Sequence, residues 1–284
     1  MPKVSVIMPS FNVGDYIQEC MDSVLKQTLQ DLEIICVDAG STDGTLELLQ
    51  KYEKQDSRIR LLVSDRKSYG YQMNLGLEAA RGQYIGIVET DDFIAPEMYE
   101  ELYKTAVLHG ADFVKADFDV FSTLEDGERV YLRYKASKYT CVRYHKIFSS
   151  EDYQSGPGTM DVFIWSGIYK KEFLDRHKIR FQETPGAAFQ DCGFRFQVAM
   201  HVRRGIFLDE SFYRYRRDNI GSSTYNKKCV LFNLSECKYL INVFRRQGLE
   251  NRDSWGYLAR EIAVIAHRPY VELLQWNQPD EETG

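Results

Sequence analysis

Short, nearly continuous apolar runs alternate with amphipathic segments over the first 110 residues of the chain. Such runs are typical of strands buried on both faces, whereas apolar residues at every third or fourth position are typical of helices. Ile17 and Met21 show the helical spacing, with Asp15 as the expected N-cap, and Ser41 or Thr42 is expected to cap the next helix. The expected strands are 4–8, 32–37, 59–63, 84–88 and 112–121.

Pro96 and Gly110 bound the helix before the fifth expected strand, because helices favour proline near their start and glycine past their end. Strands that alternate with helices predict a parallel sheet covered on both faces. Ligands of such sheets bind beyond the carboxyl ends of the strands. Polar residues collect at this edge, in the segments 9–12, 38–41 and 89–92.

The second half of the chain is less regular. Residues 122–150 read as an excursion with a turn at Asp126–Gly127, and 161–182 include a short helix. A helix is expected over 189–202 and a strand over 205–208, and the pattern beyond about 229 is helical. We therefore expect a main domain over 1–225, with halves 1–110 and 111–225, and a helical C-terminal extension over 226–284.

Charge and cysteine content narrow the protein class. The formal net charge is −6 over 284 residues, which argues against a general nucleic-acid binder. No pair of the six cysteines forms C-x-x-C or fits a zinc motif, so we expect reduced cysteines and a cytoplasmic location. The chain enters a strand directly without a signal peptide, and it has no apolar run of about 18 residues that would span a membrane. Peripheral contact with the inner membrane face stays open.

The sharpest chemical feature is the acidic segment Glu89-Thr90-Asp91-Asp92, between an apolar strand and a helix. Three carboxylates in four residues repel one another unless a cation compensates. Mg²⁺ and Mn²⁺ prefer oxygen ligands and use one or two carboxylates together with substrate phosphates. Helix capping by Asp92 is the alternative, but it accounts for one acid and not for three.

Two further acids lie at expected element ends, Asp38 after the second strand and Asp191 at a helix start. Asp38 opens a strand–turn–helix junction, where a tight turn is the commoner explanation and a contact with a nucleobase or ribose is the functional one. Asp191 is either another N-cap or a general base that takes a proton from an acceptor.

The run 213–219 concentrates arginines and aromatic residues. A solvated charged face is the ordinary explanation. A phosphate clamp is the functional one, because arginine pairs well with phosphate oxygens.

Taken together, these segments resemble family-2 glycosyltransferases, the inverting GT-A enzymes of bacterial polysaccharide and glycoconjugate synthesis. The resemblance covers about residues 3–225 and rests on the order and spacing of many short motifs. The matching segments are 4–12, 16–29, 37–45, 74–76, 80–92, 164–169, 173–174, 189–191, 215–219 and 221–223.

The resemblance implies an α/β fold of the GT-A kind, with a Rossmann-like, mostly parallel sheet flanked by helices. It implies a hexosyl- or N-acetylhexosaminyl-transferase. The donor would be a nucleoside diphosphate sugar, with a UDP-sugar expected, and the acceptor a saccharide or lipid-linked saccharide. Mg²⁺ or Mn²⁺ is the implied cofactor, held by Asp91 with help from Glu89, and Asp191 is the implied catalytic base.

The resemblance also implies which residues surround the substrates. Trp165 and Gln190 belong to the acceptor side. The implied donor-binding residues are Pro9, Ser10, Phe11, Asn12, Asp38, Gly40, Ser41, Gln72, Asn74, Glu89, Thr90, Asp92, Arg216 and Arg217.

Three positions differ from the usual motifs of the family: Ala39, Glu89 and Gln190 stand where it often has aspartate, aspartate and glutamate. The differences at 39 and 89, together with the helical tail 229–276, leave open a nucleotide-sugar-binding or scaffolding subunit with little activity of its own. A dinucleotide-binding oxidoreductase is disfavoured because the first strand–helix turn lacks G-x-G-x-x-G. A nucleotidyltransferase is disfavoured because no glycine- and lysine-rich loop follows the first strand. Periodicity does not decide whether the C-terminal helices pack on the core, pair with a second copy or touch a membrane.

Overall fold

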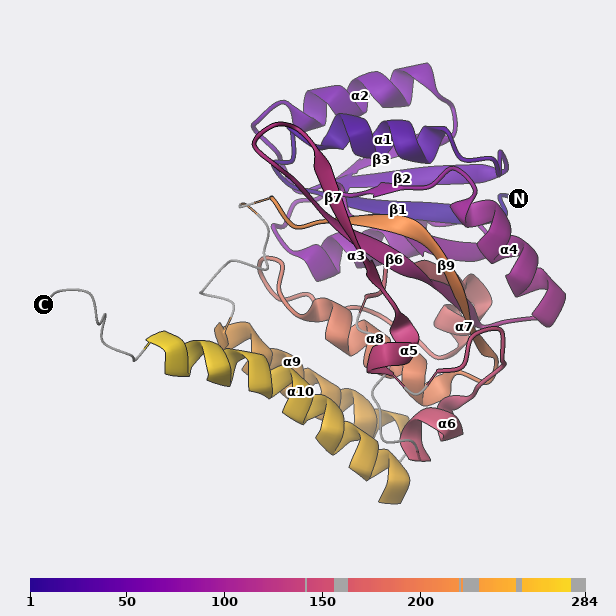
Figure 1. Ribbon diagram of the computed structural model, residues 1–284, viewed down its shortest axis with the longest axis vertical. Coiled ribbons are helices and arrows are strands. Elements are labelled where there is room, and N and C mark those ends of the chain that lie inside the picture. Colours follow the sequence, from indigo (N-terminus) through magenta and orange to yellow (C-terminus); the bar gives the residue numbers. More distant parts are fainter. Residues whose placement is uncertain (141, 156–162, 220, 222–229, 249–251, 277–284) are drawn as a thin grey trace, which may run out of the picture.

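The computed structural model describes residues 1–140, 142–155, 163–219, 221, 230–248 and 252–276. Within these residues nine strands form one sheet in the order β3-β2-β1-β4-β8-β6-β9-β5, with β7 paired to β6. Helices flank the sheet, and the two long helices at the end of the chain lie together below it (Figure 1). The expected α/β class is confirmed.

The first half of the chain forms the parallel part of the sheet. Its elements are β1 (Val4–Ser10), α1 (Ile17–Leu25), β2 (Leu32–Asp38), α2 (Thr45–Gln55), β3 (Ile59–Val63), α3 (Tyr69–Ala79) and β4 (Tyr84–Ile87). β1 pairs in parallel with both β2 and β4, and β2 pairs in parallel with β3. Alternate side chains face opposite layers: Ile7 of β1 meets α3 at Gly76, and Cys36 of β2 meets Met21 of α1. The apolar runs therefore predicted these strands correctly.

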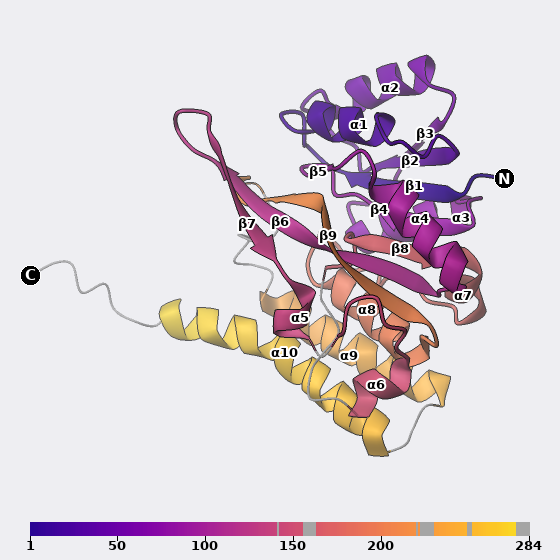
Figure 2. The same cartoon turned by 45° about the vertical axis from the view of Figure 1, so that its right-hand side comes forward.

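The second half makes the sheet mixed. It adds β5 (Phe93–Ile94), α4 (Met98–His109), β6 (Phe113–Thr123), β7 (Arg129–Tyr134), β8 (Gly167–Lys170) and β9 (Gly205–Arg216). β8 is antiparallel to both β4 and β6 and lies between them, so β4 and β6 run in the same direction without touching as neighbours. The hairpin of β6 and β7 extends away from the rest of the sheet (Figure 2).

Four strands differ from the sequence-based expectation: β9 is longer than expected, and β5, β7 and β8 lie where no strand was expected. β9 continues to Arg216 instead of ending near 208, because it pairs in parallel with β6 along most of its length. β5 was not expected at all. Its two residues pair with β9, which brings the segment after Asp92 beside the arginine-rich run.

The remaining helices are α5 (Ala136–Tyr139), α6 (Ser150–Ser155), α7 (Lys171–Arg176), α8 (Gln190–His201), α9 (Val230–Gln247) and α10 (Arg252–Trp276). α9 and α10 lie side by side and pack on α8 and α6 (Figures 1 and 2). Leu240, Phe244, Tyr257 and Leu258 are buried in this packing, so the expected helical extension is present and covers the core. The expected domain boundary at 225 and 226 lies outside the described residues.

Two expected helix caps are wrong. Tyr16, not Asp15, occupies the N-cap position of α1, without a side-chain cap bond. Gly44 precedes α2 with φ 97°, so neither Ser41 nor Thr42 caps that helix. Pro96 lies just before α4, and Gly110 ends it with φ 57°, as expected.

Two observations concern the chain's surroundings. Cys20, Cys36, Cys192 and Cys237 are free thiols, and the other two cysteines, 141 and 229, lie outside the described residues. Across the residues that the structure describes, every helix is too short or too polar to cross a bilayer.

Candidate active site

Asp38, at the end of β2, organises the carboxyl edge of the sheet. Its Oδ1 accepts hydrogen bonds from the amides of Gly40 and Ser41, at 2.9 and 2.8 Å. Its Oδ2 accepts from the hydroxyls of Ser10 and Ser41, at 2.9 and 2.6 Å. A carboxylate accepts about four hydrogen bonds, and the fully buried Asp38 receives that number from the chain itself. Asp38 therefore holds the loops after β1 and β2 together, and its contact with a nucleoside stays a prediction.

Side chains also join the loop after β1 to the loop after β2. Asn12, with φ 53°, donates its amide hydrogen to Ser41 Oγ and accepts a bond from the Thr42 amide through its Oδ1. The Gly14 amide donates to Asp43 Oδ2 at 2.8 Å. The Ser41 hydroxyl and the Thr42 amide thus hold the two loops together, two or three residues before the N-cap residue Gly44.

Three other predicted donor-binding residues hold the framework of the site. Gln72 donates from Nε2 to the carbonyls at the ends of β1 and β2, at Ser10 and Val37. Thr90 donates to the carbonyl of Pro9 at 2.8 Å. Asn74 bonds both the amide and the carbonyl of Phe181, which ties the segment between α7 and α8 to α3. Gln72, Thr90 and Asn74 are all buried.

Phe11 differs from this framework because it presents an open surface. Its side chain is 41% exposed, and Lys67 Nζ lies 4.6 Å from the centre of its ring. Gly40, on the neighbouring loop, is half-buried with φ 77°. An exposed ring beside a cation, at the carboxyl edge of a parallel sheet, is a suitable surface for a planar base.

The acidic segment after β4 is held from several sides. Glu89 Oε1 accepts a hydrogen bond from the hydroxyl of Tyr69 at 2.6 Å. Asp92 is buried and accepts from the hydroxyl of Tyr213 and the amide of Arg216. Asp92 therefore does not cap α4, which begins at Met98.

Asp91 is half-buried and is oriented by a residue that the sequence did not single out. Asn219 donates from Nδ2 to Asp91 Oδ2 at 2.8 Å. In the described part of the chain, Oδ1 of Asp91 makes no hydrogen bond and is available to a ligand. Asn219 lies in the arginine-rich run 213–219, and nothing in its sequence position indicated that its side chain contacts Asp91. Tyr69 and Tyr213 were missed for a similar reason, because their bonds join distant segments.

Burial and mutual repulsion make these acids hard to ionise. Burial, together with the charges of Asp91 and Asp191, raises the pKa of Glu89 to about 8, although the Tyr69 hydroxyl opposes the shift. Burial and then Asp91 raise the pKa of Asp92 well above its usual value. Asp191 lies close enough to Glu89 to contribute, although the two are distant in sequence.

Asp191 occupies the first turn of α8 and is half-buried. Phe189 is the N-cap residue, with φ 64°, so Asp191 is not a cap. Its Oδ1 accepts a hydrogen bond from the Cys192 amide at 3.0 Å. Burial raises the pKa of Asp191, and Arg195 opposes that shift. A carboxylate made more basic beside an acidic cluster is suited to take a proton, and its role as the base stays a prediction.

The two predicted acceptor-side residues are buried. Gln190 bonds Thr184, Gly186 and Ala188, so it holds the loop that leads to Asp191. Trp165 is 6% exposed and stacks on Tyr213, with ring centres 4.1 Å apart. Trp165 thus supports the tyrosine that bonds Asp92, and a direct acceptor contact by either residue stays a prediction.

Arg216 and Arg217 differ in their surroundings. Arg216 is 7% exposed, and its guanidinium bonds the Asp91 carbonyl, Glu19 and Asp218. Arg217 is exposed and lies over the ring of Tyr215. The run 213–219 is therefore mostly buried or half-buried at the end of β9 and just after it, and is not a solvated face. Arg217 is the better placed of the two arginines to meet a phosphate.

The residues around Asp91 fit a hard divalent cation. Their donors are carboxylate oxygens, and the Arg216 guanidinium is directed at a backbone carbonyl rather than at these carboxylates. Asp91 and Glu89 alone are too few for a complete cage, but Mg²⁺ sites commonly complete their shell with water and substrate phosphates. Within the described residues a group of three potential ligands lies elsewhere, at His145, Asp209 and Glu210, and all three are exposed.

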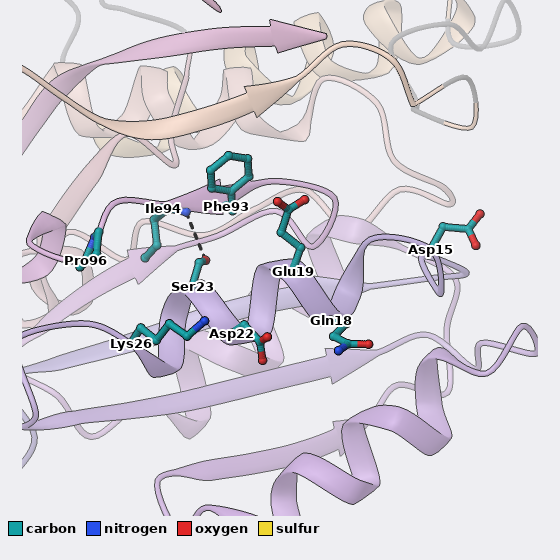
Figure 3. A pocket seen from close by; sticks show the side chains of 9 residues that line it. All are labelled: Asp15, Gln18, Glu19, Asp22, Ser23, Lys26, Phe93, Ile94 and Pro96. Carbon is teal, nitrogen blue, oxygen red and sulfur yellow. Dashed lines mark hydrogen bonds between the residues drawn. The ribbon is translucent and has the colours of Figure 1, made fainter. Parts of the chain in front are cut away.

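A surface groove of about 530 Å³ lies over α1 and β5 (Figure 3). Asp15, Glu19 and Asp22 line it, and none of the predicted substrate or metal residues does. For that reason we do not place the donor there.

Comparison with known sequences gives a consistent result. The model of the family described as Glycosyl transferase family 2 matches residues 5–207. The glycosyltransferase EpsJ of Bacillus subtilis is 32% identical over 219 residues, which cover 77% of this chain and 62% of EpsJ. Glycosyltransferase GlyG of Streptococcus pneumoniae is 30% identical over 249 residues, covering 86% of this chain and 79% of GlyG. The chain thus spans about three-fifths of one relative and about four-fifths of the other.

Solved structures share the fold at low identity. TarS 1-349 of S. aureus, in complex with UDP-GlcNAc, has a TM-score of 0.74 at 19% identity and covers 99% of this chain and 77% of its own. The mannosyltransferase PcManGT of Pyrobaculum calidifontis, in complex with GDP-Man and Mn²⁺, has a TM-score of 0.58 at 17% identity, with 97% and 79% covered. The expected GT-A architecture is confirmed.

Proposed function

The chain belongs to glycosyl transferase family 2, and we propose that it is a metal-dependent enzyme that transfers a sugar from a UDP-sugar to an acceptor hydroxyl. We further propose that the transfer inverts the anomeric configuration and that the acceptor is a saccharide or lipid-linked saccharide of a bacterial polysaccharide or glycoconjugate. The observation that supports the proposal is the acidic segment after β4, in which Asn219 orients Asp91 and Tyr69 bonds Glu89. The charge of Asp191 contributes to the raised pKa of Glu89.

The donor would lie along the carboxyl edge of the sheet. The exposed ring of Phe11 supports stacking with the base, and the half-buried Gly40 leaves room beside it. Asp38, Gln72 and Thr90 keep the loops in place through the bonds described above. A UDP-sugar is the first choice, since the TarS complex contains UDP-GlcNAc and has the same architecture.

Asp91, with Glu89 second, would hold Mg²⁺ or Mn²⁺, and the cation would supply charge stabilisation to the departing diphosphate. Asp191 takes the proton of the acceptor hydroxyl while the acceptor oxygen forms a bond to the anomeric carbon. The bond from that carbon to the diphosphate oxygen breaks on the opposite face, and the nucleoside diphosphate leaves. Arg217 meets the phosphate charge from the end of β9. One displacement of this kind inverts the anomeric centre.

The test is calorimetric titration of UDP into the full chain with and without Mn²⁺. We expect binding that depends on Mn²⁺ and that loses this dependence in Asp91→Asn. Asp31→Asn is the matched control, because Asp31 is exposed and lies just before β2, at the opposite end of the strand from Asp38. UDP binding that is equally strong with and without Mn²⁺ would contradict the role of Asp91 as a metal ligand. Metal-dependent binding without hydrolysis or transfer of any UDP-sugar would favour a binding subunit over an enzyme.

A further inference from the structure

Glu19 on α1 joins two segments that are remote from it in sequence. Its carboxylate accepts bonds from both terminal nitrogens of Arg129 on β7, at 2.6 and 3.1 Å. The same carboxylate accepts a bond from Nη2 of Arg216, at the end of β9, at 2.6 Å. Figure 3 shows the Glu19 side chain rising from α1 toward Phe93, while Asp22 on the same helix points away. One carboxylate thus bridges two guanidinium groups and offsets part of their charge.

The Arg216 guanidinium is confined by aromatic rings. It lies 4.8 Å from the ring centre of Tyr16 and 4.7 Å from that of Phe121. Its Nε donates to the carbonyl of Asp91 at 2.7 Å, and its amide donates to Asp92 Oδ1 at 2.7 Å. Arg216 is therefore a direct structural link from Glu19 to the acidic segment.

The two arginines would repel each other without Glu19. Arg129 also packs on Phe121, 5.2 Å from its ring centre, so both guanidinium groups share one aromatic side chain. Among the described residues, the Arg216 guanidinium has a second ion-pair partner in Asp218, at 3.5 Å. Loss of the charge on Glu19 leaves two neighbouring cations, and it favours movement of Arg216 toward Asp218 and away from the Asp91 carbonyl.

Asp91 depends on the end of β9 at two points. Its backbone carbonyl is held by Arg216, and its Oδ2 is held by Asn219 three residues later. A displacement of Arg216 is therefore expected to shift both the backbone of Asp91 and the orientation of its carboxylate. Partners that orient metal-binding carboxylates commonly alter metal affinity by about 10- to 100-fold when they are removed.

We propose that Glu19 is a positioning residue that fixes the orientation of Asp91 through Arg216. The part of this inference that concerns metal affinity rests on the proposed function, whereas the part that concerns the position of Asp91 does not.

Glu19→Gln is the main variant, since it removes the charge and keeps the size. Asp22→Asn is the matched control, because Asp22 lies on the same helix, lines the same groove and bonds Tyr52 instead of an arginine. The side chain of Glu19 is 36% exposed, so both variants should fold, and melting temperatures verify this.

The first readout is the affinity for Mn²⁺ in the presence of UDP, measured by paramagnetic resonance of the free ion. We expect Glu19→Gln to bind Mn²⁺ about 10-fold more weakly or worse, and Asp22→Asn to match the wild type. The double variant Glu19→Gln/Arg129→Met should regain part of the affinity, because the repelling cation is gone. Equal affinities of the two single variants would overturn the proposal, and so would a double variant no better than Glu19→Gln.

The second readout needs no metal. A crystal structure of Glu19→Gln should show the Arg216–Asp91 bond broken and Asp91 shifted. An unchanged bond would overturn the inference about Glu19, whatever the metal affinity. A wild-type protein that fails to bind Mn²⁺ and UDP would instead contradict the proposed function, and the crystal structure would still decide the role of Glu19.

Discussion

Arg195 on α8 and Glu261 on α10 form a two-point ion pair in which both side chains are completely buried. Breaking such a pair leaves an uncompensated charge in the core and commonly lowers stability by about 3–5 kcal/mol. We expect Glu261→Ala to lose that much free energy of unfolding in denaturant titrations. Asp175→Ala is the control, because Asp175 bonds the partly exposed Lys171 and Arg180, and its loss should be about 1 kcal/mol or less. Similar losses in the two variants would contradict the role of the buried pair.

Gly193 faces α9 at a distance that excludes any side chain. A Cβ there would lie 2.1 Å from Oε1 of Glu236 and 3.0 Å from the ring of Tyr239. We expect Gly193→Ala to destabilise the protein by about 1–3 kcal/mol through overpacking. Gly256→Ala on α10 should be neutral or stabilise by up to about 1 kcal/mol, since its nearest neighbour is a flexible arginine at 3.7 Å. Thermal unfolding measures both, and effects of the same sign would contradict the close packing of α8 and α9.

Glu236 should make stability fall as pH rises. Burial, followed by the charge of Asp191, raises its pKa from 4.5 to about 8, so the folded protein binds a proton that the unfolded chain releases. The stabilisation is complete below the unfolded pKa of 4.5 and is lost as pH rises through the folded pKa of about 8. Free energies of unfolding measured between about pH 5 and pH 9 should therefore decline less in Glu236→Gln than in the wild type. Parallel curves for the two proteins would count against this coupling.

Asp191→Asn should abolish most of the turnover without loss of donor binding. Removal of a working general base commonly lowers the rate by about 10²- to 10⁴-fold. Asp253→Asn provides the control, since Asp253 also lies in the first turn of a helix but is exposed on α10. Steady-state transfer rates and UDP titrations distinguish the two effects. An unchanged transfer rate in Asp191→Asn would remove the residue from catalysis.

Phe11→Ala should weaken UDP binding, because an exposed ring at the carboxyl edge is lost. Stacking of a base on an aromatic side chain contributes about 1–3 kcal/mol in other base-binding proteins, which corresponds to a roughly 5- to 150-fold change in affinity. Tyr139→Ala tests general effects of aromatic removal, since Tyr139 is 64% exposed on a distant helix. If both variants bind UDP as the wild type does, the base lies elsewhere.

The strands of the first half could be predicted because their signal is local. Val4–Ser10 and Leu32–Asp38 are nearly continuous apolar runs that end in polar residues, and each forms a buried parallel strand. The position of β8 could not be predicted in this way. Its four residues pair with β4 and β6, which are far away in sequence, and no local pattern specifies such partners.

The candidate site shows the same limit in its side chains. The acidic segment and Asp191 were recognised from their places after a strand and at a helix start. The sequence did not distinguish residues that hold the loops in place from residues that present a surface or atom to a ligand. Asp38 and Ser41 use their oxygens on each other, whereas Phe11 and Asp91 keep a free face or atom. That distinction depends on bonds between loops, and a motif alone does not contain them.

The insertion of β8 between β4 and β6 has a consequence for modularity. Residues 1–110, expressed alone, would expose the unpaired edge of β4, which invites strand-to-strand aggregation. The sheet is complete only when β4 and β8, which lie about eighty residues apart in the chain, have paired, and such non-local pairing slows folding. A chimera that joins residues 1–110 of this chain to the second half of a related chain therefore needs a β8 that fits the edge of β4. A division of the chain at its midpoint alone does not ensure that fit.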